Sequence, residues 1–183
     1  MTKFSPTIGS LTLGAVVLIA LWNAPQSPRL AAAEPAEATE SAAESAPLVA
    51  ARRQAEALHE AMHTTLRIVH HQYFREDEGL AIPAEILKGV FAELEEHQGI
   101  TLRWLVVEGQ AMNSDHKPQD AFETAAVRAL KQGATAHETV ADGVYRRAGP
   151  ITLSNECLKC HVPRRTSNDD QTAGLLISIP LQH

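Results

Sequence analysis

The sequence has few cysteines, few aromatic residues and no cluster of basic residues. Its 183 residues include 2 cysteines and 4% aromatic residues, and the formal net charge is -6. Nucleic-acid-binding domains carry a basic patch or stripe, so we expect no nucleic acid partner. The chain also has neither a Ser-His-Asp spacing nor a phosphate-binding glycine loop. Composition and motifs therefore give no support to nucleic-acid binding, Ser-His-Asp hydrolysis or phosphate binding.

Both cysteines lie in one motif, Cys157-Leu158-Lys159-Cys160-His161. Cys-x-x-Cys-His is the attachment motif of c-type haem. Two thiols at this spacing can add to the two vinyl groups of one haem as thioethers, and the adjacent imidazole can bind the iron as the proximal ligand. Imidazole is also a nitrogen donor that suits iron. The motif predicts one covalent haem c, attached through Cys157 and Cys160 and ligated by His161.

Two other uses of a Cys-x-x-Cys pair compete with haem attachment. A redox disulfide usually opens a helix after a strand in a βαβ unit, whereas this pair follows the segment 150–156. A structural zinc site needs four ligands, and the sequence has no second Cys-x-x-Cys pair. Haem attachment is the prediction, and a thiol–disulfide pair is the first alternative.

The N-terminal residues have the pattern of an export segment. Lys3 precedes an uncharged, mostly apolar run from Ile8 to Trp22, which is typical of a secretory signal or a short membrane anchor over residues 1–23. This run is shorter than the roughly 20 residues that a membrane-spanning helix needs. Export agrees with the haem prediction, because c-type attachment takes place outside the cytoplasm. We therefore expect a periplasmic or other extracytoplasmic protein, either secreted or attached to the membrane through residues 8–22.

A linker separates this segment from the folded domain. Residues 24–47 are mostly Ala, Glu, Pro and Ser. Such a composition cannot bury enough apolar surface to offset the entropy lost on ordering, so we expect a disordered linker. Residues 48–183 then form one domain, since the hydrophobic content of 44% is enough for a core.

A long helix is predicted from Leu48 to Phe74, because the segment has neither Gly nor Pro and its apolar residues recur at helical spacing. Six of these residues form one stripe: Ala55, Leu58, Met62, Leu66, Val69 and Tyr73. His59, His63 and His70 flank this stripe, whereas His71 points nearly opposite. We expect the first three histidines to face the interior.

The remaining pattern predicts an α+β fold, with a small antiparallel sheet covered by helices on one side. Helices are expected over residues 83–97 and 118–133, each opened by a proline. Strands are expected over residues 100–108 and 173–181, and a hairpin around Asp142-Gly143. The haem would lie between the long helices and the attachment loop.

Three segments resemble a bacterial family of c-type haem-binding, PAS-like domains. The first runs from Arg103 to Glu123 and reads Arg, then Asn-x-x-x-x-Pro, then aromatic-Glu, ending in Phe122-Glu123. The second runs from Tyr145 through the haem motif, and the third is the apolar segment 173–180. Together the resemblance covers about residues 50–181.

The resemblance implies a PAS-like α+β domain that binds haem c and acts in electron transfer or in redox or ligand sensing. Members are stand-alone exported haem proteins or the extracytoplasmic sensor regions of membrane signalling proteins. No chemistry on a substrate is implied, so we expect the protein not to be an enzyme. A redox partner protein or a separate signalling partner is expected instead.

The sixth iron ligand is where this sequence departs from the family. Members can use a cysteine near the end of the first long helix, but here Cys157 and Cys160 are both assigned to thioethers. His70 is the preferred replacement, because it lies in that region and beside the apolar stripe. His63, His59 and Met62 are the alternatives, with His116 more remote. An open, five-coordinate iron is a further alternative.

Arginines bracket the haem motif: Arg146, Arg147, Arg164 and Arg165. A guanidinium suits a carboxylate, so one of the four is a candidate partner of a haem propionate, with solvated surface arginines as the alternative. Trp104 and Tyr145 are expected in the core of the sheet.

The predicted function is that of an exported, cytochrome-like protein with one haem c, acting in one-electron transfer or in redox or ligand sensing. One alternative is a small peroxidase-like enzyme, which would need an open distal site. The other is a haemless Cys-x-x-Cys thiol–disulfide module. A six-coordinate spectrum would argue against the first alternative, and covalently retained haem against the second.

Overall fold

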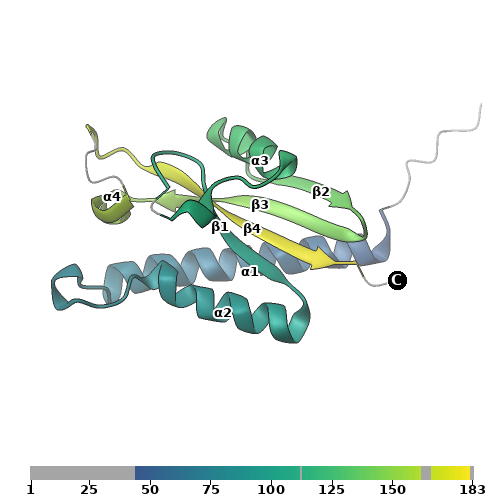
Figure 1. The fold of residues 1–183 in the computed structure, drawn as a ribbon, viewed down its shortest axis with the longest axis horizontal. Helices are drawn as coiled ribbons and strands as arrows, with labels where there is room; N and C mark the ends of the chain where they lie inside the picture. Colours follow the sequence, from purple (N-terminus) through teal and green to yellow (C-terminus); the bar gives the residue numbers. More distant parts are fainter. Residues whose placement is uncertain (1–43, 112, 162–165, 182–183) are drawn as a thin grey trace, which may run out of the picture. The chain divides into compact units, whose positions relative to one another are not determined.

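The structure is a computed structural model that describes residues 44–111, 113–161 and 166–181 (Figure 1). The side chains of Glu76, Cys160 and His161 are outside this description. The predicted export segment over residues 1–23 lies outside the described residues, as does nearly all of the linker. Within the described residues, no helix is both long enough and apolar enough to cross a membrane.

Helices and strands follow one another in an α+β order. The α-helices are α1 (Ala46–Gln72), α2 (Pro83–Gln98), α3 (Ala121–Lys131) and α4 (Asn155–His161). The strands are β1 (Thr101–Val106), β2 (His137–Ala141), β3 (Val144–Leu153) and β4 (Gln171–Pro180). Two 3-10 helices, η1 (Glu76–Glu78) and η2 (Ser114–His116), lie in the connections after α1 and β1.

The four strands form one antiparallel sheet in the order β1-β4-β3-β2. Strand β4 pairs with β1 on one side, with Trp104 opposite Leu175, and with β3 on the other, with Gly149 opposite Leu175. Pro180 ends β4, where a missing backbone N–H costs little, as the sequence predicted. The small antiparallel sheet of the α+β prediction is confirmed.

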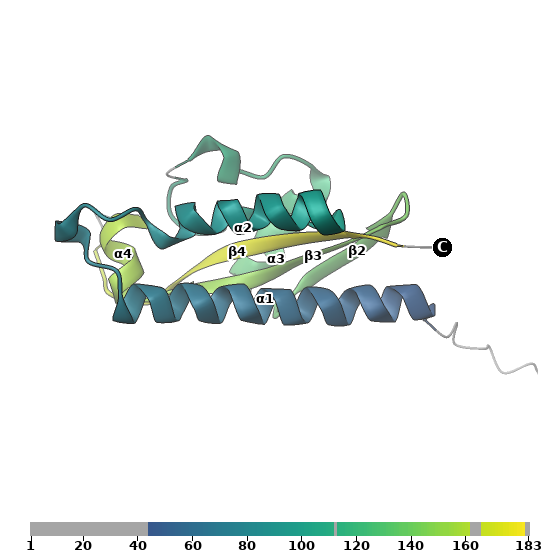
Figure 2. The same ribbon diagram turned by 90° about the horizontal axis from the view of Figure 1, so that it is seen from below.

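Helices cover both faces of this sheet, whereas the sequence predicted helices on one side. Figure 1 shows α1 and α2 on one face and α3 on the other, and Figure 2 shows α1 and α2 running along the sheet. Neighbouring residues of a strand point to opposite faces, so Trp104 and Leu105 belong to different cores. The apolar side of α3 covers the second core through Ala126 and Leu130. Both faces of these strands are apolar, which requires a helix on each.

Helix α1 follows the predicted stripe except at its end. Ala55 and Leu66 are buried, and Leu58 and Met62 pack against the core. Tyr73 is 68% exposed, so its predicted place on the buried stripe is wrong. The helix ends at Gln72, and the chain turns before the position of Tyr73 can face the sheet.

The hairpin between β2 and β3 forms around the predicted two-residue turn. Asp142 and Gly143 both have a positive φ, 52° and 72°, as a tight turn that matches the twist of its strands requires. Residues Ala141 and Val144 pair directly across it. The hairpin prediction is confirmed.

Candidate functional site

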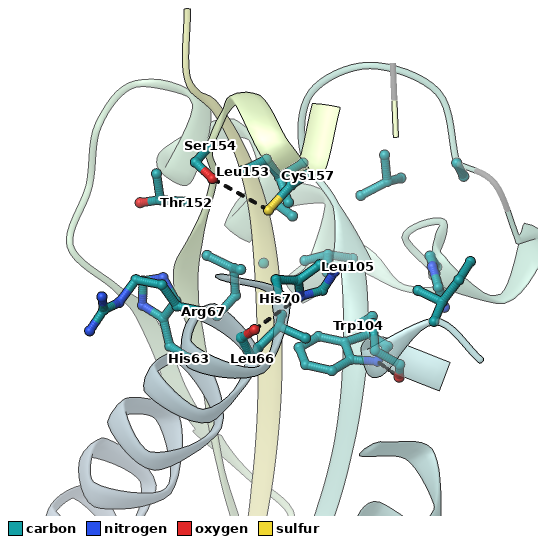
Figure 3. Close-up of a pocket in the computed structure, with 18 of the residues that line it drawn as sticks. His63, Leu66, Arg67, His70, Trp104, Leu105, Thr152, Leu153, Ser154 and Cys157 are labelled. Atoms are coloured by element: carbon teal, nitrogen blue, oxygen red, sulfur yellow. Dashed lines mark hydrogen bonds between the residues drawn. The ribbon is translucent and has the colours of Figure 1, made fainter. Parts of the chain in front are cut away.

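A cavity of about 340 Å³ opens where α1, α4 and the ends of three strands meet (Figure 3). This volume is within the range of roughly 300–1,000 Å³ found for small-molecule and cofactor sites. Apolar side chains make much of its wall: Leu66, Ile82, Trp104, Leu105, Ile151 and Leu153. The cavity also contains Cys157 from the haem motif, together with His63 and His70 from α1.

The Cys-x-x-Cys-His motif is helical, whereas the sequence predicted an attachment loop. Helix α4 begins after Ser154, whose carbonyl accepts a hydrogen bond from Leu158 at 3.1 Å, and Leu158 is fully buried. The thiol of Cys157 lies on the cavity wall, 3.7 Å from the Ser154 hydroxyl. The side chains of Cys160 and His161 lie outside the described residues.

His70 lies in the last turn of α1 and lines the same cavity as Cys157 (Figure 3). Its Nδ1 is 2.9 Å from the carbonyl oxygen of Leu66. A carbonyl can only accept a hydrogen bond, so Nδ1 carries the hydrogen and, in the neutral ring, Nε2 keeps a free lone pair. Metal-binding histidines are usually held in this way, with the second ring nitrogen donating to a carbonyl or carboxylate. His70, which the sequence preferred as sixth ligand, therefore lines the cavity with the lone pair of its Nε2 free.

Of the alternatives His63, His59 and Met62, only His63 lines the cavity. His63 lines the cavity two turns from His70. His59 and Met62 are not among the lining residues: Met62 packs against the core, and the His59 ring lies against Gly149. Burial, with help from the nearby charges of His63 and Arg147, lowers the pKa of His59. His59 is thus a packed side chain beside the sheet and not part of the cavity wall.

Residues 59–63 read His-Glu-Ala-Met-His, the spacing of a zinc-binding His-Glu-x-x-His helix, and this pattern is visible in the sequence. The rings of His59 and His63 have centroids 6.0 Å apart. A zinc site needs at least a third protein ligand, and no group of three His, Cys, Asp or Glu side chains suited to a metal occurs within the described residues. The cationic Arg147 beside His59 also opposes a bound cation.

One wall of the cavity is polar, and sequence reasoning gave it little weight. It comprises Gln110, Asn113 and His116 from the connection between β1 and α3. The Nε2 of His116 is buried and has no hydrogen-bond partner among the described residues, and burial with the nearby Lys88 lowers the pKa of this imidazole. Its position in a polar stretch of sequence conceals this burial, which arises only because η2 folds back over β1.

Two of the arginines expected near haem carboxylates form ion pairs away from the cavity. Arg146 pairs with Asp120 at 2.7 Å and with Glu123 at 3.1 Å, while Arg147 pairs with Glu138. Neither lines the cavity, so neither is placed for the predicted propionate contact. Their strand turns these side chains toward acidic residues away from the cavity. Arg164 and Arg165 lie outside the described residues.

The cavity wall includes Arg67 instead, one turn before His70 on α1 (Figure 3). Arg67 lies within a helix and far from the Cys-x-x-Cys-His motif in sequence, so its position alone did not mark it as a cavity residue. Helical spacing from His70 is the signal that could have found it, because residues three apart share one side of a helix.

Trp104 is both a core aromatic residue and a cavity residue. Its ring packs against Phe91 in a tilted arrangement, with 4.9 Å between centroids, and its indole N–H donates to the Ala84 carbonyl at 3.0 Å. The polar atom is thereby satisfied, and the ring presents an apolar surface to the cavity. Tyr145 is fully buried in the same core, as predicted, but does not line the cavity.

The fold and the site define an α+β domain with a largely apolar cavity between a Cys-x-x-Cys-His helix and a histidine-bearing helix. The family model for Tll0287-like proteins matches residues 36–175, and the chain belongs to this family.

This chain is similar to a solved structure that is described as the crystal structure of the cyanobacterial heme-protein Tll0287. The identity is 20%, the match covers 74% of this chain and 93% of that one, and the TM-score is 0.43. No curated protein matches the sequence.

Proposed function

We propose that this protein is a haem protein in which one haem c is attached through Cys157 and Cys160, with His161 and His70 as axial iron ligands. One observation carries the proposal: Cys157 and a His70 ring with a free Nε2 face the same largely apolar cavity. Family membership supports it, since a solved protein of that name is described as a heme-protein. A PAS-like description of the domain and an extracytoplasmic location belong to the same proposal.

When bound, haem supplies an iron that accepts and releases one electron. The chain would contribute attachment, ligation and exclusion of water. Each cysteine forms one C–S bond by adding its S–H across a vinyl C=C bond, so the hydrogen ends on the neighbouring carbon. Leu66, Trp104 and Leu153 provide apolar walls, and a low-dielectric surrounding is one means by which proteins adjust haem potentials.

The position of His70 suits either electron transfer or sensing. The residue lies in the last turn of α1, where helices unravel most readily because their final carbonyls lack helical partners. A bond from His70 to iron would fix this turn, and its loss on reduction or gas binding would release it. The protein would then be an electron carrier if the bond persists in both redox states, or a sensor if it breaks.

The test is the absorption spectrum of protein matured in a host with c-type haem machinery, in oxidised and reduced forms. Haem retained on a denaturing gel by wild type and lost by Cys157→Ala/Cys160→Ala would establish attachment. A low-spin wild type and a high-spin His70→Ala variant would establish ligation. His97→Ala is the control, because His97 is an exposed histidine near the end of α2 that does not line the cavity. A wild type without covalent haem would overturn the proposal.

A small haem enzyme with an open distal site is the second candidate. The observation in its favour is the buried, unpartnered Nε2 of His116 on the cavity wall, since peroxide chemistry needs an acid–base group beside the iron. A high-spin, five-coordinate wild type would favour this candidate over the carrier or sensor.

A further inference from the structure

We propose that Arg67 binds a haem propionate and thereby sets the redox potential; this inference rests on the proposed haem site. The starting observation is the charge of the cavity wall. Its two carboxylates have partners: Glu85 pairs with Lys88 at 2.8 Å, and Glu156 contacts His71 at 3.2 Å. Arg67 is a cavity residue too, and its guanidinium makes no hydrogen bond or ion pair with any described residue.

A cation without a protein partner beside a ligand cavity favours an anionic group on the ligand. Haem carries two propionates, and the planar guanidinium fork matches the geometry of a carboxylate. The polar wall across the cavity is less suitable, because its His116 has a lowered pKa and so a weakened tendency to carry charge. Among the described cavity residues, Arg67 is thus the positively charged group best placed to bind an anionic group of the ligand.

The position of Arg67 agrees with the orientation that the haem motif requires. Vinyl and propionate groups lie at opposite edges of the porphyrin, so attachment at Cys157 directs the propionates away from α4. Figure 3 shows Arg67 beside His63 on α1, away from Cys157. Arg67 is also solvent-exposed, which places it at the cavity mouth. Carboxylates are least costly there, because they keep part of their hydration.

Helix α1 would then hold the haem at two points. Residues 67 and 70 are three apart and share one side of the helix. The shorter imidazole of His70 would reach the iron, and the longer, flexible Arg67 side chain would reach the porphyrin edge. A positive charge at that edge offsets the propionate charge, so its removal disfavours electron uptake by the iron.

The experiment compares full-length, haem-loaded wild type with Arg67→Ala, Arg67→Lys and Arg53→Ala. Arg53 is the matched control, because it is an exposed arginine of the same helix that does not line the cavity. We expect Arg67→Ala to keep covalent haem and the wild-type spin state, to shift the propionate band in the resonance Raman spectrum, and to lower the midpoint potential. Arg67→Lys should shift the same band with a smaller fall in potential, since lysine keeps the charge but not the fork.

An Arg67→Ala protein with a wild-type propionate band and potential would overturn the inference. If Arg67→Ala does not mature, Arg67→Lys decides, and an unchanged propionate band in that variant overturns it. These outcomes differ from failure of the proposed function, which would be the absence of covalent haem from wild type. An equal fall in potential in Arg53→Ala would also overturn the inference, because the effect would then be general to positive charge on α1.

Discussion

Arg103 on β1 donates a hydrogen bond to the carboxylate of Glu123 on α3, and Glu123 is 3% exposed. Arg146 contacts the other carboxylate oxygen at 3.1 Å, and the backbone N–H of Gln119 donates to the Glu123 carboxylate at 2.6 Å. Arg103 also donates to the carbonyls of Asp115 and Lys117, on either side of His116. The segment from Arg103 to Glu123 therefore acts as a clamp that holds the polar cavity wall.

Removing the carboxylate of this clamp should be costly. Glu123→Ala leaves two guanidinium groups without their buried partner, and breaking such a pair costs about 3–5 kcal/mol. Urea denaturation of the variant measures this loss. Glu96→Ala is the control, because Glu96 is exposed on α2, and surface changes usually stay within about 0.5 kcal/mol. A Glu123→Ala variant as stable as the control would show that the clamp does not stabilise the domain.

Gly149 leaves room for the imidazole of His59. A Cβ at this position would lie 2.6 Å from two atoms of the His59 ring. We expect Gly149→Ala to reduce the free energy of unfolding by about 1–3 kcal/mol, as is typical of overpacking. In a His59→Ala background the same change should cost much less, and a double-mutant cycle by chemical denaturation measures the difference. Equal costs in the two backgrounds would contradict this packing.

The same histidine should make stability depend on pH. Burial, with His63 and Arg147, lowers the pKa of His59 in the folded state below its usual 6.5. The unfolded chain then binds this proton first as the pH falls, so the free energy of unfolding decreases below about pH 6.5. His59→Gln removes this contribution. Denaturation at pH 8 and pH 5 should show a smaller fall in the free energy of unfolding in the variant than in wild type. An equal fall would contradict a lowered pKa for His59.

Two glycines should respond in opposite directions to the same substitution. Gly143 has a φ of 72° in the hairpin turn, where an L side chain costs about 1–2 kcal/mol, so Gly143→Ala should destabilise. Gly89 lies inside α2, and a Cβ at this position would meet nothing within 4 Å, so Gly89→Ala should stabilise by about 0.5–1 kcal/mol. Thermal denaturation measures both, and shifts of the same sign would be inconsistent with these backbone assignments.

Local patterns in the sequence were enough for most elements of the fold. The periodicity of α1, Pro83 at the start of α2 and the Asp142-Gly143 turn each depend on neighbouring residues, and each is found near its predicted place. The helical form of the haem motif was missed, because seven residues are too few for periodicity to show.

The site was harder to predict from local sequence patterns than the fold. Cys157 and His70 were identified through the motif and the helical wheel, and they line one cavity. Arg67 and His116 were given little or no weight, because their roles depend on what a distant segment places beside them. The same is true of Arg146, whose acidic partners on α3 become its neighbours only when α3 covers the sheet.

The strand order has a consequence for the assembly of the domain. Strands β1 and β3 do not pair with each other, because β4 lies between them. Since β4 follows α4 in the chain, the Cys-x-x-Cys-His motif precedes the strand that completes the sheet. The sheet around the cavity cannot close until β4 pairs with both β1 and β3. If haem is attached as proposed before this pairing, closure of the sheet would enclose it.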